Sequence, residues 1–305
     1  MADPDRTASL MTPSKLAQIK PKGVASPALW LTQMAADAGH LHVRRLGELR
    51  AQLQAQALLR DVSPLISELA RLAEALPRLD FGLLQSRGWW ARTTGKSRSA
   101  GAEFAAQFNQ IEPIAAGLAV QTQALTNKEQ EQATATELAL LELDVEHRAI
   151  DKIIEQGTRW LYDMRTQLKT RQAAPADQAG QEQLKDDAAR CEILVGRLKA
   201  LRAVSSAAQQ SHQHGQVAAG RRAALLQLLR HALASGVKDW QGRLSPLAAA
   251  ADASSSASSV EAAMEAHRDL QLCVKQAVAD CGQLRGQENA LAESLAALGT
   301  QLEAA

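Results

Sequence analysis

The chain has 305 residues, and its 34 basic and 33 acidic side chains leave a formal net charge of +1. A balance this even excludes a global attraction to nucleic acid or to anionic lipid. One Tyr and three Phe are too few for a single compact core of this length, whereas long helices that pack along Ala/Leu seams do not need them. The composition therefore predicts an all-α protein: an elongated bundle of long antiparallel helices with coiled-coil seams.

The first segment, residues 1–22, carries acidic residues and lacks an apolar run. We expect a disordered lead-in there rather than a secretory signal. No stretch of the chain approaches about 18 uninterrupted apolar residues, so we expect no membrane-spanning helix. The cysteines Cys191, Cys273 and Cys281 are too few for a disulfide framework and are expected to be free thiols in a reducing compartment. These features predict a cytoplasmic protein.

Residues 23–80 carry two helix-start signals, Ser26-Pro27 and Ser63-Pro64. In each, a capping side chain precedes a proline at the first helical position. The first helix should reach Leu59 and the second should end at Pro77. This pattern predicts an N-terminal helical hairpin over 23–80, followed by a long-helix region over 81–305.

The next stretch, residues 81–101, contains Gly, Ser and Thr and is expected to be a loop. A very long helix should then run from Ala102 to about Gln172, with Pro113 either kinking it or marking its true start. Apolar residues at alternating spacings of four and three predict a coiled-coil seam in its second half. The seam comprises Ile150, Ile154, Gly157, Leu161, Met164 and Leu168.

Residues 173–183 should form a turn, after which a helix returns from Leu184 to about Trp240. Its weakly apolar middle, residues 205–220, is where we expect a bend. Residues 245–259 are expected to form a Ser/Ala loop around Pro246. The last helix, from about Val260, ends in a second seam. This seam comprises Cys281, Leu284, Glu288, Leu291, Leu295, Leu298 and Leu302.

A pair of tryptophans in the expected loop lies among basic residues, with no acid between Asp80 and Glu103. The residues are Arg87, Trp89, Trp90, Arg92, Lys96 and Arg98. Indoles beside cations suit a membrane interface or an anionic partner. The alternative is that the tryptophans plug the end of a helical bundle. The sequence leaves both interpretations open and favours the second.

No motif for catalysis or for a cofactor is recognisable. Gly95-Lys96-Ser97 is not a phosphate loop, because the motif requires a glycine where Trp90 stands. His212 and His214 are two residues apart, so a helix would point their imidazoles to different sides. We therefore predict no cofactor, no metal site and no enzymatic activity.

The order of features resembles the toxic-anion (tellurite) resistance family, TelA-like. The resemblance spans about residues 81–302. It rests on an aromatic, basic loop before a helix, on a long helix containing Leu138 and Leu141, on a return helix containing Leu194 and Leu198, and on a Val237–Gln241 ending. The positions that match the family are Gln209, Gln210 and Trp240. The resemblance implies a cytoplasmic bacterial protein that contributes to tolerance of tellurite or other toxic anions and to the envelope stress response. Peripheral attachment to the inner membrane is left open.

The function expected from these observations is a non-enzymatic helical scaffold or adaptor with protein partners and without nucleic acid. Three alternatives stay open. One is a peripheral membrane protein that uses the Trp89-Trp90 loop, and another is a generic coiled-coil component of a secretion or phage-like system. The third is an oxyanion reductase acting through its cysteines, which the missing redox site disfavours. Self-association of the chain is also left open.

Overall fold

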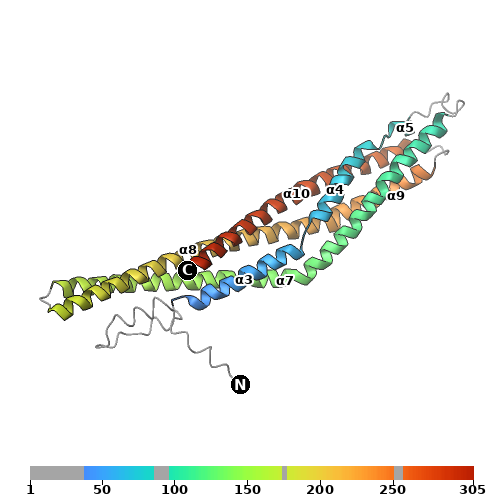
Figure 1. The fold of residues 1–305 in the computed structure, drawn as a ribbon. Coiled ribbons are helices and arrows are strands. Elements are labelled where there is room, and N and C mark those ends of the chain that lie inside the picture. The colour runs from blue at the N-terminus through green and yellow to red at the C-terminus, as the bar shows by residue number, and fades with distance from the viewer. Residues whose placement is uncertain (1–37, 86–95, 174–176, 251–256) are drawn as a thin grey trace, which may run out of the picture. The chain divides into compact units, whose positions relative to one another are not determined.

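The computed structural model describes residues 38–85, 96–173, 177–250 and 257–305, without the side chains of residues 85, 96–99 and 257–258. Throughout these ranges the regular secondary structure is helical, and no strand occurs in them. The predicted all-α fold is confirmed (Figure 1). No described helix contains a stretch that is both apolar and uncharged enough to cross a bilayer.

The elements are dominated by a few long helices, of which α7 alone contains 77 residues. In chain order they are α3 (His40–Leu59), α4 (Ser63–Ala75), the 3₁₀ turn η2 (Leu76–Arg78), α5 (Gly82–Gln85), α7 (Lys96–Gln172), α8 (Gln178–Gln227), the π-helical segment η3 (Leu228–Leu233), α9 (Ala234–Ala249) and α10 (Ala257–Ala304).

The chain divides into two compact units. Unit 1 combines residues 1–56, 135–216 and 289–305, and unit 2 combines residues 57–134 and 217–288. Of the region 23–80 that was expected to form a hairpin, residues 23–37 lie outside the described part, α3 belongs mostly to unit 1 and α4 belongs to unit 2. Each of the two helices buries apolar side chains within its own unit.

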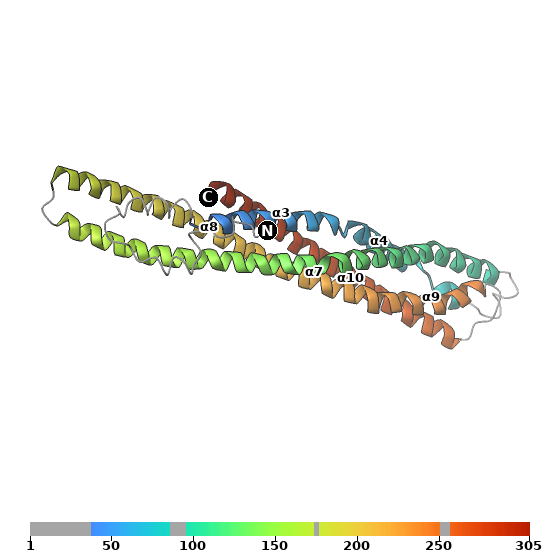
Figure 2. The same cartoon turned by 90° about the horizontal axis from the view of Figure 1, so that it is seen from below.

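Unit 1 packs α3 against α7, α8 and the end of α10. His42 Nδ1 lies 2.6 Å from Glu146 Oε2 of α7. Arg50 of α3 donates from Nε to the Leu295 carbonyl of α10 (2.9 Å). Arg197 of α8 donates to the Ala38 carbonyl (3.1 Å), just before α3 begins. These bonds tie α3 to its neighbours, along which Figure 2 shows it lying.

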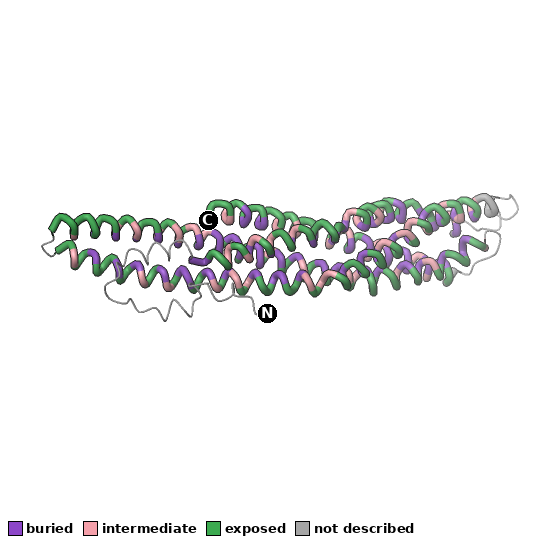
Figure 3. The backbone as a smooth tube through the Cα atoms, turned by 60° about the horizontal axis from the view of Figure 1, so that its bottom comes forward, coloured by how far each residue is buried: buried purple, intermediate pink, exposed green. Residues whose placement is uncertain are grey.

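The end of α7 and the beginning of α8 form an antiparallel pair within unit 1 (Figures 1 and 2). Arg165 pairs with Glu192 (2.6 Å) and Arg171 pairs with Asp187 (2.9 Å). The residue numbers of the partners on α8 decrease as those on α7 increase, which shows that the two helices are antiparallel. All members of the seam predicted from Ile150 to Leu168 are buried. Figure 3 shows the corresponding buried stripes between the helices and exposed residues on the outer faces. The predicted coiled-coil seam is confirmed.

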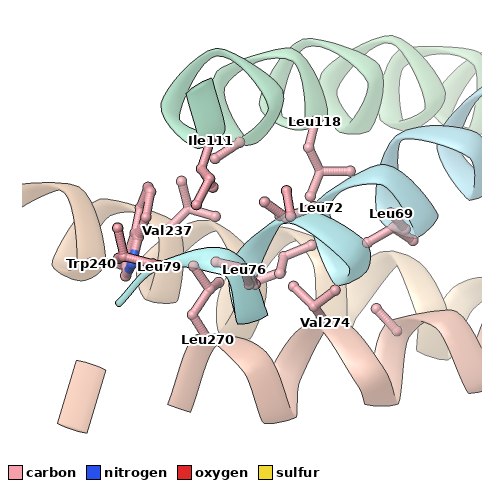
Figure 4. Packing of buried hydrophobic residues seen from close by; sticks show 14 of the residues in the cluster. Leu69, Leu72, Leu76, Leu79, Ile111, Leu118, Val237, Trp240, Leu270 and Val274 are labelled. Atoms are coloured by element: carbon pink, nitrogen blue, oxygen red, sulfur yellow. The ribbon is translucent and has the colours of Figure 1, made fainter. Parts of the chain in front are cut away.

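Unit 2 is built around a cluster of buried apolar side chains from α4, α7, α8, η3, α9 and α10. Figure 4 shows Leu69 and Leu72 of α4 lying between Leu118 of α7 and Val274 of α10. Their spacing of three residues places both on one helix face. Trp240 and Phe104 are among its largest fully buried side chains. The three phenylalanines of the chain and Trp240 all belong to this core.

Several expected boundaries were wrong. The region 81–101 is partly helical, since it contains α5 and the start of α7, and Pro113 lies inside α7 rather than at its start. Helix α9 continues through Pro246 to Ala249 instead of ending in a loop. The helix start expected at Ser26-Pro27 lies outside the described residues. Within them, α3 begins directly after Gly39, whose φ of 73° lies in a region that glycine adopts without steric cost.

Residues 205–220, where a bend was expected, form an uninterrupted α-helix. The departure from α-helical hydrogen bonding occurs further on, over Leu228–Leu233, where η3 is π-helical. A π-turn accommodates an extra residue within a helix. Low apolar content therefore did not locate the irregularity.

Candidate functional site

The described part of unit 2 contains a groove of about 410 Å³ between α7 and the η3–α9 segment. Its volume falls in the range typical of ligand pockets in proteins. The floor is apolar and is formed by Leu118 of α7 together with Leu229, Leu233 and Val237. All four residues belong to the buried core cluster, so the floor is anchored in the interior of unit 2.

The rim of the groove is polar and carries only positive charge. It comprises Thr122, Gln123, Thr126, Arg230, Lys238 and Gln241. Arg230 and Lys238 are both exposed, and neither forms an ion pair with any described residue. No Asp or Glu lines the groove. The lining of the groove therefore carries a net positive charge beside an apolar floor.

The two ends of the groove differ. Gln241 donates to Glu112 Oε1 across 3.2 Å, so a carboxylate lies close to the Lys238 end. Because α7 and α9 are antiparallel, Thr126 lies at the opposite end, with Leu229 and Arg230. Thr126 is only 3% exposed, and its Oγ1 has no hydrogen-bond partner among the described residues. A buried hydroxyl without a partner costs about 1–3 kcal/mol.

One wall of the groove is the π-helical segment η3, and the sequence analysis did not anticipate it. Segments of this kind are uncommon and occur frequently at functional sites. A local signal was present. Leu225, Leu229, Leu233 and Val237 follow one another at spacings of four, which drift away from the 3.6-residue period of an α-helix. An inserted residue restores the register, and all four side chains are buried.

A second surface feature lies on α7 in unit 1. Leu138, Leu141 and Val145 are 55%, 58% and 63% exposed. Their spacings of three and four residues place them on one face of the helix. The adjacent face is occupied by α3, through the Arg45–Glu142 and His42–Glu146 pairs. We call these three residues the α7 stripe.

A buried polar cluster joins α7 and α8 in unit 1. His147 Nε2 lies 3.0 Å from Asp144 Oδ1, and the rings of His147 and His212 are 6.4 Å apart. His212 Nδ1 bonds the Leu140 carbonyl at 2.9 Å, which fixes its ring. The expectation that His212 and His214 point to different sides agrees with their surroundings, since His212 is buried and His214 is half-buried.

A charged cluster in unit 2 brings together residues from α7, α8, α10 and the link between α3 and α4. Arg222 Nη1 lies 3.1 Å from Glu129 Oε1, and Arg60 Nη1 lies 3.2 Å from Glu129 Oε2. Arg222 also pairs with Glu288. Burial raises the pKa of Glu288 and lowers the pKa of Arg60. The signal in the sequence was Glu288 itself, a charged residue inside an apolar seam.

The positions that match the TelA-like family are not brought together. Gln209 and Gln210 are exposed on α8 in unit 1. Trp240 is fully buried in unit 2, where its ring lies 5.2 Å from that of Phe108. It does not line the groove.

The predicted membrane or anion contact lies largely outside the described residues. Arg87, Trp89, Trp90 and Arg92 are not described. Lys96 and Arg98 belong to the first turn of α7, but their side chains are not described. Neither interpretation of this loop is tested, and both stay predictions.

The cysteines are free and do not form a pair, with Cys191 and Cys281 buried and Cys273 half-buried. Burial raises the pKa of all of them, and that of Cys281 to about 11. A raised pKa makes a thiol a poor nucleophile at neutral pH. Within the described ranges, no group of three or more His, Cys, Asp or Glu residues is placed to hold a metal ion.

Comparison with protein-family models found no match. Neither the curated proteins nor the solved structures include a significantly similar chain.

Proposed function

We propose that this protein is a non-enzymatic helical scaffold or adaptor that docks a partner protein through the α7 stripe. Within this proposal the partner contributes a helix whose apolar residues cover Leu138, Leu141 and Val145. The biological setting that we propose is resistance to tellurite or other toxic anions and to envelope stress, in the cytoplasm. That setting comes from the resemblance to the TelA-like family.

The observation that supports docking is the exposure of the α7 stripe. More than half of each of its side chains is accessible, although the three occupy a single helical face. Aliphatic residues in contact gain about 25 cal/mol for each Å² removed from water. An exposed row at alternating spacings of three and four is the pattern by which one helix receives another. Scattered exposed apolar residues would not have this meaning.

The surroundings of the stripe favour a helix as the partner. The neighbouring pairs, Arg45–Glu142 and Arg148–Asp144, place charges of both signs beside the apolar row. Flanking charges of this kind select partner and orientation in coiled coils. A second copy of this chain could supply the helix, and the experiment must distinguish that case from a different protein.

The test replaces the stripe with glutamine, as Leu138→Gln, Leu141→Gln and Val145→Gln combined. A matched control carries Leu58→Gln, Ile193→Gln and Leu272→Gln, which change exposed apolar residues that form no row. In the native host, deletion of the gene should sensitise cells to tellurite. When each variant is expressed in the deletion strain, the control should restore tellurite tolerance, whereas the stripe variant should not.

The same variants are compared for association with a partner by crosslinking in cells and for oligomeric state by light scattering. Loss of a specific crosslinked partner, or of self-association, in the stripe variant alone supports docking at this face. Unchanged tolerance after deletion, together with no associated protein, would contradict the proposed function.

A further inference from the structure

We propose that the groove of unit 2 binds a single-chain aliphatic carboxylate, that is, a fatty acid. Its carboxylate lies at Arg230 and its alkyl chain follows Leu233 and Val237 toward Ala115. The proposal goes beyond the adaptor function and does not depend on it. The groove lies wholly in unit 2, whereas the α7 stripe lies in unit 1.

The dimensions of the groove suit an extended chain. Its α7 wall runs from Ala115 to Thr126, which spans about 16 Å at 1.5 Å per residue. The groove is open on one side, and its volume of about 410 Å³ accommodates an extended alkyl chain. An alkyl chain lies along it in contact with both walls.

The charges of the groove determine the ligand's sign and orientation. Both rim cations are unpaired among the described residues, and no acid lines the groove. A cationic or zwitterionic headgroup gains nothing there. Glu112, which accepts from Gln241, offsets Lys238 at one end. At the other end, Glu129 lies one turn beyond Thr126, but its ion pairs are with Arg60 and Arg222. Arg230 therefore keeps its charge for the anionic head.

A second observation at the same end is the hydroxyl of Thr126. It is buried and lacks a hydrogen-bond partner in the described structure. Other threonines in α7 donate to the carbonyl four residues earlier, as Thr158 does to Ile154. A carboxylate beside Arg230 accepts from the guanidinium. Rotation of the Thr126 side chain toward the groove would let its hydroxyl, which has no partner among the described residues, donate to the same carboxylate.

Isothermal titration of the full chain with decanoate, below its micellar concentration, tests the proposal. We expect saturable binding of one decanoate per chain and no binding of decyltrimethylammonium. Arg230→Gln should weaken binding about tenfold or more, because a hydrogen-bonded charge partner is lost. Lys238→Gln should change it less than about threefold, and Arg221→Gln, which alters an exposed arginine outside the groove, should leave it unchanged.

A substitution that fills the groove tests the proposal independently of the charge changes. Ala119 lines the groove but is exposed, so Ala119→Phe should block the channel while circular dichroism shows an intact fold. Decanoate binding should then be lost. The proposal is overturned if decanoate does not bind, if Ala119→Phe or Arg230→Gln binds it like the wild type, or if Lys238→Gln is the more harmful change.

Two other ligands are tested as competing outcomes. An acidic amphipathic peptide that binds the groove while decanoate does not would assign the site to a partner protein. Binding only to phosphatidylglycerol vesicles, without free decanoate, would assign it to a lipid surface. Either result overturns the fatty-acid proposal. Neither bears on the α7 stripe, whose variants should titrate decanoate like the wild type.

Discussion

Trp240 donates its indole N–H to Nδ1 of His267 across 3.1 Å in the core of unit 2. The imidazole also lies edge-on to Phe81, with ring centroids 5.2 Å apart. Burial lowers the pKa of His267, and a weaker opposing effect comes from a bond to the Leu76 backbone. The core therefore favours the neutral imidazole. A proton on Nδ1 would point at the indole N–H and remove the acceptor of this hydrogen bond.

This contact predicts a loss of stability in acid. The pKa of His267 is lower in the folded chain than in the unfolded chain, where it is about 6.5. The unfolded state therefore binds more protons between these two values, and the free energy of unfolding decreases as pH falls through that window. Urea denaturation measured from pH 7.5 to pH 5 should show the decrease.

His267→Asn is the matched control for this prediction. Asparagine offers a carbonyl oxygen near the position of Nδ1, so it can accept from Trp240 without titrating. The slope of stability against pH should be smaller in this variant than in the wild type. Equal slopes would show that the acid sensitivity belongs to other groups.

The cysteines should differ in reactivity. Cys273 is half-buried, whereas Cys191 and Cys281 are buried, and burial raises the pKa of Cys281 to about 11. Only the thiolate attacks disulfide reagents, so access favours Cys273 over both buried thiols, and the pKa of about 11 further disfavours Cys281. Native protein treated with dithiobisnitrobenzoate at pH 7.5 should be modified at Cys273 first, as mass spectrometry would show. Equal modification of Cys281 before unfolding would contradict the burial of that thiol.

Much of the fold was predictable from local periodicity. The seam from Ile150 to Leu168 needs only the regular return of apolar residues every three or four positions, and every member is buried. Capping and proline signals were less reliable. They located the start of α4 near Ser63, although no side-chain cap forms there. Helix α7 begins at Lys96 rather than Ala102, with Pro113 inside it, and α9 continues past Pro246.

The candidate site was not predictable in the same way. The groove depends on which stretch of α7 faces η3, and no local pattern encodes that register. The charged cluster has the same origin, since Arg60, Glu129, Arg222 and Glu288 are far apart in sequence and meet only in the packed unit. What the sequence did contain were two irregularities, the four-residue spacings at Leu225–Val237 and the charge at Glu288.

The charged cluster predicts a large effect from a single substitution. Glu129 is buried between Arg60 and Arg222. Glu129→Gln leaves the two guanidinium groups without their shared carboxylate, and breaking a buried pair in this way costs about 3–5 kcal/mol. Urea denaturation should show this loss. Glu131→Gln, at an exposed position two residues along α7, should change stability by less than about 0.5 kcal/mol, and similar losses in both variants would contradict a special role for the cluster.

Two glycines near the start of α3 should respond to alanine with opposite signs. Gly39 has a φ of 73°, and a Cβ there would lie 3.0 Å from Leu201 Cδ2. Gly39→Ala should therefore destabilise the protein by about 1–2 kcal/mol through backbone strain alone, with the contact adding to it. Gly47 lies inside α3, and no neighbouring atom comes within 4 Å of where an added Cβ would stand. Gly47→Ala should stabilise by up to about 1 kcal/mol. Thermal or urea denaturation of the two variants should differ in the direction of the shift, and a stabilising Gly39→Ala would show that the chain does not turn at Gly39 as described.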